Sequence, residues 1–160
     1  MNTLYVMVGI PGAGKTHWAK QFIKNNPNVQ YVSRDEIRMS LLDDNDEYFA
    51  QERKVFNRFV TRIVILLNDH QDVIADATHL SQASRAKLIN NITNRGISLN
   101  DFVIEFIFIN PTLEQCLRNN DVREGRAYVP KSQIRRMWHQ LEPPSANEFK
   151  NCKGVMTINV

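Results

Sequence analysis

The stretch Gly9–Thr16, which reads G-I-P-G-A-G-K-T, decides the fold of this chain. It fits the pattern G-x-x-x-x-G-K-[ST] without exception. An apolar run rich in strand-forming residues precedes it at 3–8, and from Thr16 to Lys24 apolar residues recur at helical spacing. A glycine-rich loop between a strand and a helix directs successive backbone N–H groups into one hollow, where phosphate oxygens bind. The sequence therefore predicts a nucleotide-binding site.

Each residue of this phosphate-binding loop, or P-loop, has an expected role. Gly12, Ala13 and Gly14 are predicted to offer backbone N–H groups to phosphate oxygens. Lys15 is placed for the β- and γ-phosphates, and Thr16 Oγ1 for Mg²⁺, so the expected ligands are ATP and Mg²⁺. A glycine-rich turn that binds nothing is the alternative. The chain has no N-K-x-D motif for guanine and no L-S-G-G-Q segment, which leaves a compact phosphotransferase.

The periodicity of apolar residues predicts five strands that alternate with helices along the chain. The expected strands cover 3–8, 29–32, 72–75, 102–109 and 155–159, and the expected helices cover 16–24, 33–42, 46–69, 81–95, a segment from about 112, and 130–141. Parallel neighbouring strands need crossover connections, which the helices supply. We therefore expect an α/β protein with a three-layer P-loop kinase fold and a mostly parallel five-stranded sheet. We also expect residues 1–160 to form a single domain, with a helical lid at about 112–141.

Charge is unevenly distributed along a chain whose net charge is only +3. Acidic residues predominate at 34–52, and Arg and Lys predominate at 115–140. Two solvated helix faces would explain this, and so would a basic flap that closes over a polyanion. No apolar run approaches the ~20 residues that span a bilayer, and no secretory leader precedes residue 8. We expect no contact with a membrane and a cytoplasmic location.

The segment Ser33–Arg38, S-R-D-E-I-R, gives the best indication of the phosphate acceptor. It falls where the second strand should end, beside the P-loop at the carboxyl edge of the sheet. An alcohol that attacks a γ-phosphate must lose its proton, and a fixed carboxylate such as Asp35 can accept it. Arg38 lies on the same helix face and could hold an anion carried by the acceptor. The alternative is a helix N-terminus with favourable acids and an outward-facing arginine.

Asp76 ends the third predicted strand, where P-loop proteins often carry an acid that orients the Mg²⁺ shell. It could instead position Arg38 or the substrate. Thr78 and His79 follow, and they could offer a hydroxyl and an imidazole to a bound phosphate. A turn threonine and a surface histidine are the alternatives for these two positions.

Three arginines, Arg118, Arg123 and Arg126, flank the loop between the last two predicted helices. A flap that closes over ATP would bring such a guanidinium to the β- and γ-oxygens. We expect at least one of the three to contact phosphate, Arg123 or Arg126 before Arg118. Surface salt bridges to Asp121 and Glu124 are the alternative.

Four motifs in the same order resemble the kinase domain of phage-type 5′-polynucleotide kinases and their bacterial end-healing relatives. They are G-x-P-G-A-G-K-T-x-W-A, S-R-D-E-I-R, D-A-T-H and R-x-x-x-x-R-x-x-R-x-x-V-P, and together they span nearly the whole chain. That family transfers the γ-phosphate of ATP to the 5′-OH end of DNA or RNA. Several relatives add a 3′-phosphatase domain with a D-x-D-G-T signature, which this chain lacks, so we expect kinase activity alone.

The resemblance also implies roles for individual residues. Lys15 and Thr16 hold ATP and Mg²⁺, Asp35 is the general base, and Arg38 holds the 3′-phosphate of the acceptor. Asp76 supports this group of residues. In the flap, the family's arginine on the ATP phosphates matches position 123 or, in the other register, position 126.

The leading hypothesis is therefore an ATP-dependent 5′-hydroxyl polynucleotide kinase whose partner is a 5′-OH nucleic acid end. A P-loop kinase of a small alcohol, such as a sugar, nucleoside or antibiotic, shares the loop and the base. A nucleotide-gated binding module with little catalysis is the second alternative. Tyr48 and Trp138 could stack on a nucleobase, although aromatic residues at helical spacing usually belong to a core.

Overall fold

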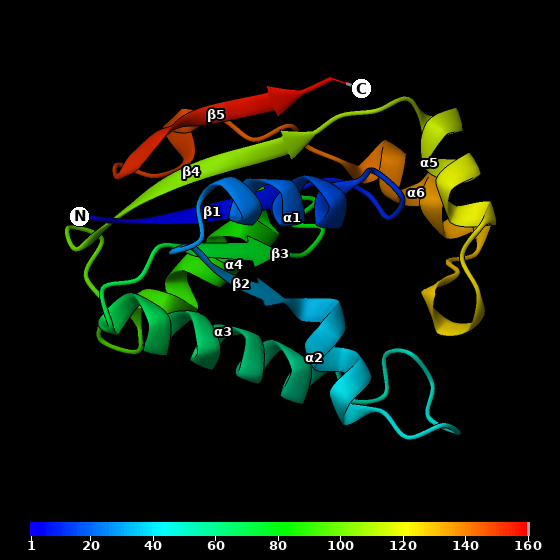
Figure 1. The fold of residues 1–160 in the computed structure, drawn as a ribbon, viewed down its shortest axis with the longest axis horizontal. Helices are drawn as coiled ribbons and strands as arrows, with labels where there is room; N and C mark the ends of the chain where they lie inside the picture. The colour runs from blue at the N-terminus through cyan, green and yellow to red at the C-terminus, as the bar shows by residue number, and fades with distance from the viewer. Residues whose placement is uncertain (160) are drawn as a thin grey trace.

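A five-stranded parallel sheet forms the centre of the molecule (Figure 1). The computed structural model describes residues 1–159, with only the backbone described for Arg126. The strands are β1 (Asn2–Val8), β2 (Gln30–Ser33), β3 (Val73–Asp76), β4 (Phe102–Ile109) and β5 (Cys152–Ile158). Their order is β2-β3-β1-β4-β5, and each neighbouring pair is parallel. The predicted α/β fold is confirmed, with a sheet that is parallel throughout.

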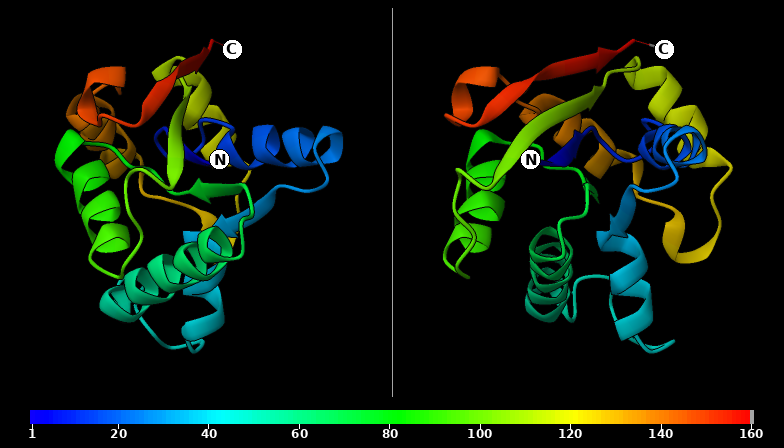
Figure 2. Two further views of the ribbon diagram at one scale, coloured as in Figure 1. Left: turned by 90° about the vertical axis from the view of Figure 1, so that its left-hand side faces the viewer. Right: turned by 60° about the vertical axis from the view of Figure 1, so that its left-hand side comes forward.

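Helices cover both faces of this sheet (Figure 2). In chain order they are α1 (Lys15–Asn25), α2 (Arg34–Leu41), α3 (Glu52–Asn68), α4 (Gln82–Thr93), α5 (Leu113–Asp121) and α6 (Lys131–Gln140), with short 3₁₀ turns at Gly125–Ala127 and Ala146–Glu148. Within residues 1–159, none of these helices is long and apolar enough to cross a membrane.

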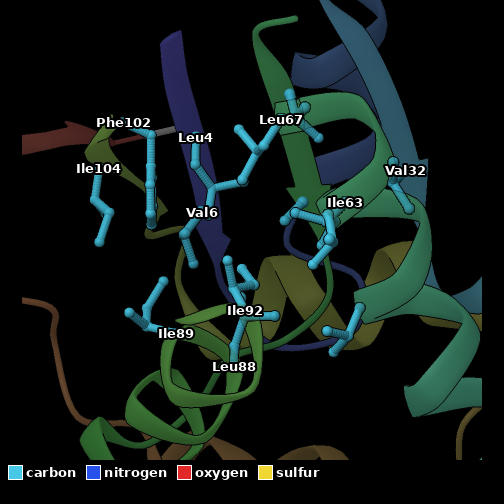
Figure 3. Packing of buried hydrophobic residues seen from close by; sticks show 14 of the residues in the cluster. Leu4, Val6, Val32, Ile63, Leu67, Leu88, Ile89, Ile92, Phe102 and Ile104 are labelled. Carbon is cyan, nitrogen blue, oxygen red and sulfur yellow. The ribbon is translucent and has the colours of Figure 1, made fainter. Parts of the chain in front are cut away.

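The two faces of the sheet bury separate hydrophobic clusters, because successive side chains of a strand point to opposite faces. Leu4 of β1 belongs to one cluster with Ile63 of α3 and Ile92 of α4 (Figure 3). Met7 belongs to the other cluster, with Ile134 of α6. The sheet is therefore the middle of three layers, as the sequence predicts.

The strands that flank the P-loop end at the same edge of the sheet. Val6 of β1 pairs with Ala75 of β3, and Ser33 at the end of β2 pairs with Asp76 at the end of β3. Residues 9–16, the start of α2 and the segment after Asp76 consequently lie at one end of the molecule, on the right in Figure 1. The connection between α5 and α6 lies at that end too.

One helix begins later than the sequence predicts. A helix is expected over 46–69, but α3 begins at Glu52, and the residues before it form turns. Tyr48 in these turns directs its hydroxyl to Asp35 of α2, at 2.7 Å. Regular burial starts only at Val55. The turns let Tyr48 contact α2, while α3 packs against the sheet from Val55 onwards.

Side-chain caps set two other helix starts. Ser33 Oγ accepts a hydrogen bond from Glu36 N at 3.2 Å, which confirms the predicted start of α2. The helix expected from about 112 is α5, which begins at Leu113 after Pro111 and the cap residue Thr112, whose Oγ1 accepts a hydrogen bond from Gln115 N. Threonine is preferred as the cap because its side chain supplies an acceptor that proline lacks.

Candidate active site

The P-loop crosses the carboxyl end of β1 and is held in shape by α5. Gly12 and Gly14 have φ of 84° and 100°, in the left-handed region that favours glycine. A Cβ on Gly12 would lie 2.5 Å from the backbone oxygen of Cys116, so glycine also permits the close approach of α5. Asn119 of α5 donates from Nδ2 to Gly12 O at 2.8 Å. The N–H of Ala13 donates to Ile10 O within the loop itself.

Lys15 lies on the inside of this loop. Its Nζ donates to Gly9 O at 2.9 Å and to Ile10 O at 3.0 Å. Burial lowers the pKa of Lys15, while the negative charges of Asp76 and Asp35 act in the opposite direction. Both carboxylates are thus close enough to the lysine for their charges to act on it. The structure brings together these three residues, which the sequence places in one site.

Asp76 lies beside Thr16, the predicted Mg²⁺ ligand. Thr16 Oγ1 donates to Asp76 Oδ2 at 3.2 Å, and Tyr31 OH donates to the same oxygen at 2.5 Å. Burial, together with the charge of Asp76, raises the pKa of Tyr31. A hydroxyl and a carboxylate are hard oxygen ligands, which Mg²⁺ prefers when phosphates and waters complete its octahedron. This donor pair next to the P-loop fits Mg²⁺.

Asp35 and Arg38 lie on one face of α2, as their spacing predicts. Arg38 Nη1 forms an ion pair with Asp35 Oδ1. Tyr48 OH donates to the same carboxylate oxygen at 2.7 Å and lies 2.9 Å from Arg38 Nη1, from which it accepts a hydrogen bond. The Asp35 side chain is 71% exposed, whereas that of Arg38 is 6% exposed. The carboxylate is thus fixed from the protein side and open to solvent.

Glu52, at the start of α3, occupies the other side of the Arg38 guanidinium. Arg38 Nη2 lies 2.7 and 3.0 Å from the two Glu52 carboxylate oxygens, and its Nε donates to one of them at 3.2 Å. Arg34 Nη2 donates to Glu52 as well, at 2.5 Å. Burial raises the pKa of Glu52, but the hydrogen bonds and charges of the two arginines outweigh it, so that this pKa is lowered.

The predicted anion-binding arginine is therefore engaged by the protein. Each of the three guanidinium nitrogens of Arg38 has a hydrogen-bond partner. The guanidinium carbon also lies 4.4 Å from the ring centroid of Tyr48. Burial alone would lower the pKa of Arg38, but Glu52, Tyr48 and Asp35 raise it. Glu52 has no predicted role, because it does not occur at a recognisable spacing from Arg38. Tyr48 is predicted only to stack on a nucleobase, whereas in the structure its hydroxyl binds Asp35 and Arg38.

The flap is the connection between α5 and α6, residues 122–130. Within it Arg123 is half-buried, and its positive charge acts to lower the pKa of Lys15. Arg123 Nη1 donates to Ala127 O at 3.5 Å. Arg118 is exposed. The side chain of Arg126 lies outside the part of the chain that is described, so the choice between the two flap arginines stays a prediction.

The ends of the flap loop are joined by Asn120, which is fully buried. Its Nδ2 donates to Val129 O at 2.6 Å, and its Oδ1 accepts from Val129 N at 2.9 Å. Asp121 pairs with Lys131 at 3.4 Å. Asn120 has no role in the sequence predictions, because an asparagine at a helix end gives no signal of a contact with a later residue.

The segment after Asp76 contacts the start of the P-loop. The carbonyl of Thr78 accepts a hydrogen bond from Gly9 N at 3.1 Å. His79 is buried, with Nδ1 2.6 Å from Met7 O, so the expectation of a surface histidine is wrong. Burial lowers the pKa of His79 to about 4, against the effect of the Met7 hydrogen bond. The ring can be buried because the Met7 carbonyl of β1 supplies a hydrogen-bond partner for its Nδ1.

This fold and loop agree with the proteins that the chain resembles. The chain belongs to the AAA_33 family, described as an AAA domain, which matches residues 4–144. A putative kinase from Chloroflexus aurantiacus is 12% identical, with a TM-score of 0.76 over 99% of this chain and 88% of that one. The predicted P-loop kinase fold is confirmed, and membership of the family implies that the chain binds a nucleotide.

Two further solved structures are similar to this chain. A chain in the Pnkp1/Rnl/Hen1 RNA repair complex is 28% identical, with a TM-score of 0.72, and the match covers 88% of this chain and 44% of that one. A fungal RNA kinase is 12% identical, with a TM-score of 0.67 over 98% of this chain and 38% of that one. This chain spans less than half the length of either. The resemblance to the kinase domain of polynucleotide kinases is confirmed.

Proposed function

We propose that this protein is an ATP-dependent 5′-hydroxyl polynucleotide kinase, which transfers the γ-phosphate of ATP to the 5′-OH end of DNA or RNA. The placement of Asp35 carries the proposal. Its carboxylate is exposed, is held by Tyr48 and Arg38, and lies within electrostatic reach of Lys15. A fixed carboxylate beside a phosphate-binding lysine suits an acceptor that must lose a proton. The 28% identity to a chain of an RNA repair complex supports a nucleic acid acceptor.

The residues divide the chemistry among them. Lys15 and Arg123 provide positive charge for the β- and γ-phosphates, and Thr16 and Asp76 would hold Mg²⁺, which would neutralise further phosphate charge. The 5′-oxygen forms a bond to the γ-phosphorus while the bond to the β–γ bridging oxygen breaks. The proton of the hydroxyl passes to Asp35. Because Asp35 is fixed before the acceptor arrives, little reorganisation is needed at the moment of transfer.

Replacement of the proposed base tests this function. Asp35→Asn should retain ATP affinity and lose roughly 10²- to 10⁴-fold in the rate of transfer from labelled ATP to a 5′-OH oligonucleotide. Glu36→Gln is the matched control, because Glu36 is an exposed acid in the same first turn of α2. Equal rates for the two variants would refute the role of Asp35. Absence of transfer by the wild-type protein, with ATP bound, would refute the function.

A kinase of a small alcohol is a second candidate, and the partners of Arg38 favour it. This guanidinium is already satisfied by Glu52, Asp35 and Tyr48, so an acceptor anion would have to compete with them. Equal rates of phosphorylation for a free nucleoside and for the same nucleoside 3′-phosphate would support this candidate. A strong preference for the 3′-phosphate would support the polynucleotide kinase.

A further inference from the structure

The turn that follows α2 presents one aromatic ring to the protein and the next to solvent. Ala50 N donates to Glu47 O, which makes Tyr48 and Phe49 the two central residues of the turn. Tyr48 turns inward and donates to Asp35. Phe49 is 55% exposed. The hydrogen bond of Tyr48 therefore fixes an exposed ring next to the carboxylate proposed as the base.

Contacts on one side hold the Phe49 ring in place. Its centroid lies 4.7 Å from that of Tyr48, with the ring planes at 89°, and 5.7 Å from the guanidinium carbon of Arg38. These neighbours are themselves tied to Asp35 and Glu52. Phe49 thus has a defined position and a large exposed apolar surface, and both of its neighbours bind the Asp35 carboxylate. Aromatic rings of this kind form platforms on which nucleobases stack.

The charges around the Phe49 ring favour a base on one side of the site and phosphates on the other. The turns that carry Phe49 also carry Asp43, Asp44, Asp46 and Glu47, which repel a phosphodiester chain. Across the same end of the molecule, α5 carries exposed Arg118 and the flap that follows it carries half-buried Arg123 (Figure 1). A nucleic acid end is therefore best placed with its terminal base on the Phe49 side and its backbone directed towards the flap.

We infer that Phe49 is the stacking platform for the base of the acceptor's 5′-terminal nucleoside. The inference rests on the proposed function and names the part of the substrate that this face of the site recognises. The face suits a nucleoside and offers nothing specific to a plain sugar, because stacking needs the flat π-surface of a base. Phe49 is a specificity residue here and takes no part in the proton transfer.

The test compares two oligonucleotides that differ only at the 5′ end. Both carry a 5′-OH, one on a thymidine and the other on a tetrahydrofuran unit that has no base. For the wild-type protein we expect the KM of the baseless acceptor to be ~10- to 100-fold higher. Phe49→Ala should raise the KM of the thymidine acceptor by a similar factor and leave that of the baseless one unchanged. Phe49→Trp should restore the difference.

Ile65→Ala is the matched control. Ile65 is 54% exposed, nearly the same as Phe49, and lies about 20 Å along α3 from Glu52. It should leave both KM values unchanged. An equal effect of Phe49→Ala on the two acceptors, or an effect on the KM of ATP instead, would overturn the inference while leaving the kinase intact. Failure of the wild-type protein to phosphorylate either oligonucleotide would overturn the proposed function and the inference with it.

Discussion

At the scale of single residues, the guanidinium of Arg38 links the two carboxylates that matter most. One edge is bound by Glu52 at the start of α3, and the other pairs with Asp35 on α2. The Arg38 side chain is only 6% exposed and therefore needs a charged partner, and half-buried Glu52 supplies it. Glu52 therefore acts on the chemistry through Arg38, as a positioning residue that keeps Asp35 in its orientation.

Glu52→Gln should weaken both catalysis and the fold. The amide removes the charge that holds Arg38, so we expect a lower kcat with little change in the KM of ATP. It should cost roughly 1.5–3 kcal/mol in the free energy of unfolding at pH 7, the usual value for a hydrogen bond to a charged group. The measurement is urea unfolding of both proteins, together with their initial rates of phosphate transfer.

The difference in the free energy of unfolding between the wild-type protein and Glu52→Gln should depend on pH. The pKa of Glu52 is lowered in the folded protein from an ordinary value of 4.5, so its stabilisation is present above pH 4.5. It is lost as the pH falls through the folded pKa. The two proteins should thus differ most at pH 7 and converge below pH 4.5. A difference that stays constant down to low pH would contradict the assignment of the ion pair.

At the scale of elements, the contact between the P-loop and α5 sets the shape of the nucleotide site. Gly12→Ala should abolish ATP binding, because its Cβ would lie 2.5 Å from the backbone oxygen of Cys116. Gly96→Ala separates the steric clash from the strain of a positive φ. Gly96 also has a positive φ, but no atom lies within 4 Å of its Cβ position. Gly96→Ala should cost about 1–2 kcal/mol in stability and leave ATP affinity unchanged. Calorimetric titration with ATP distinguishes them, and similar affinities would contradict the steric argument.

The elements that the sequence predicts well are those with local signals. The P-loop, the apolar run of β4 and the cap at Ser33 are each specified by residues within a few positions of one another. The start of α3 is not specified by local residues. Tyr48 falls within the predicted helix, but in the structure it lies in a turn, where its hydroxyl binds Asp35 of α2. Glu52 and Asn120 were missed for the same reason. Their partners lie in other elements, and only the fold brings them together.

At the scale of the whole molecule, the uneven charge of the sequence surrounds one site. The acidic turns before α3 and the flap between α5 and α6 lie at the end of the molecule where the P-loop is (Figure 1). The two segments are separate in the chain, and the parallel sheet places both beyond the carboxyl ends of its strands. Such a site suits the end of a charged polymer, which agrees with the proposed function.

The stability of the whole fold should respond to His79. Its pKa is lowered from 6.5 to about 4 in the folded protein, so the unfolded chain binds more protons between these values and stability falls as the pH drops across them. His79→Asn should remove this slope, because asparagine does not titrate. Asparagine is chosen because it tolerates the φ of 44° at this position. His70→Asn, at an exposed site with φ of 56°, should retain the slope. Unfolding by urea from pH 7 to pH 4 measures it, and an unchanged slope in His79→Asn would exclude this origin.

The most direct test of the account is the position at which labelled phosphate arrives. The protein is incubated with γ-labelled ATP and two oligonucleotides of one sequence, the first with a 5′-OH and the second already 5′-phosphorylated. We predict label at the 5′ end of the first alone, and its loss in Asp35→Asn. Label on both oligonucleotides, or equal labelling by the wild-type protein and Asp35→Asn, would contradict it.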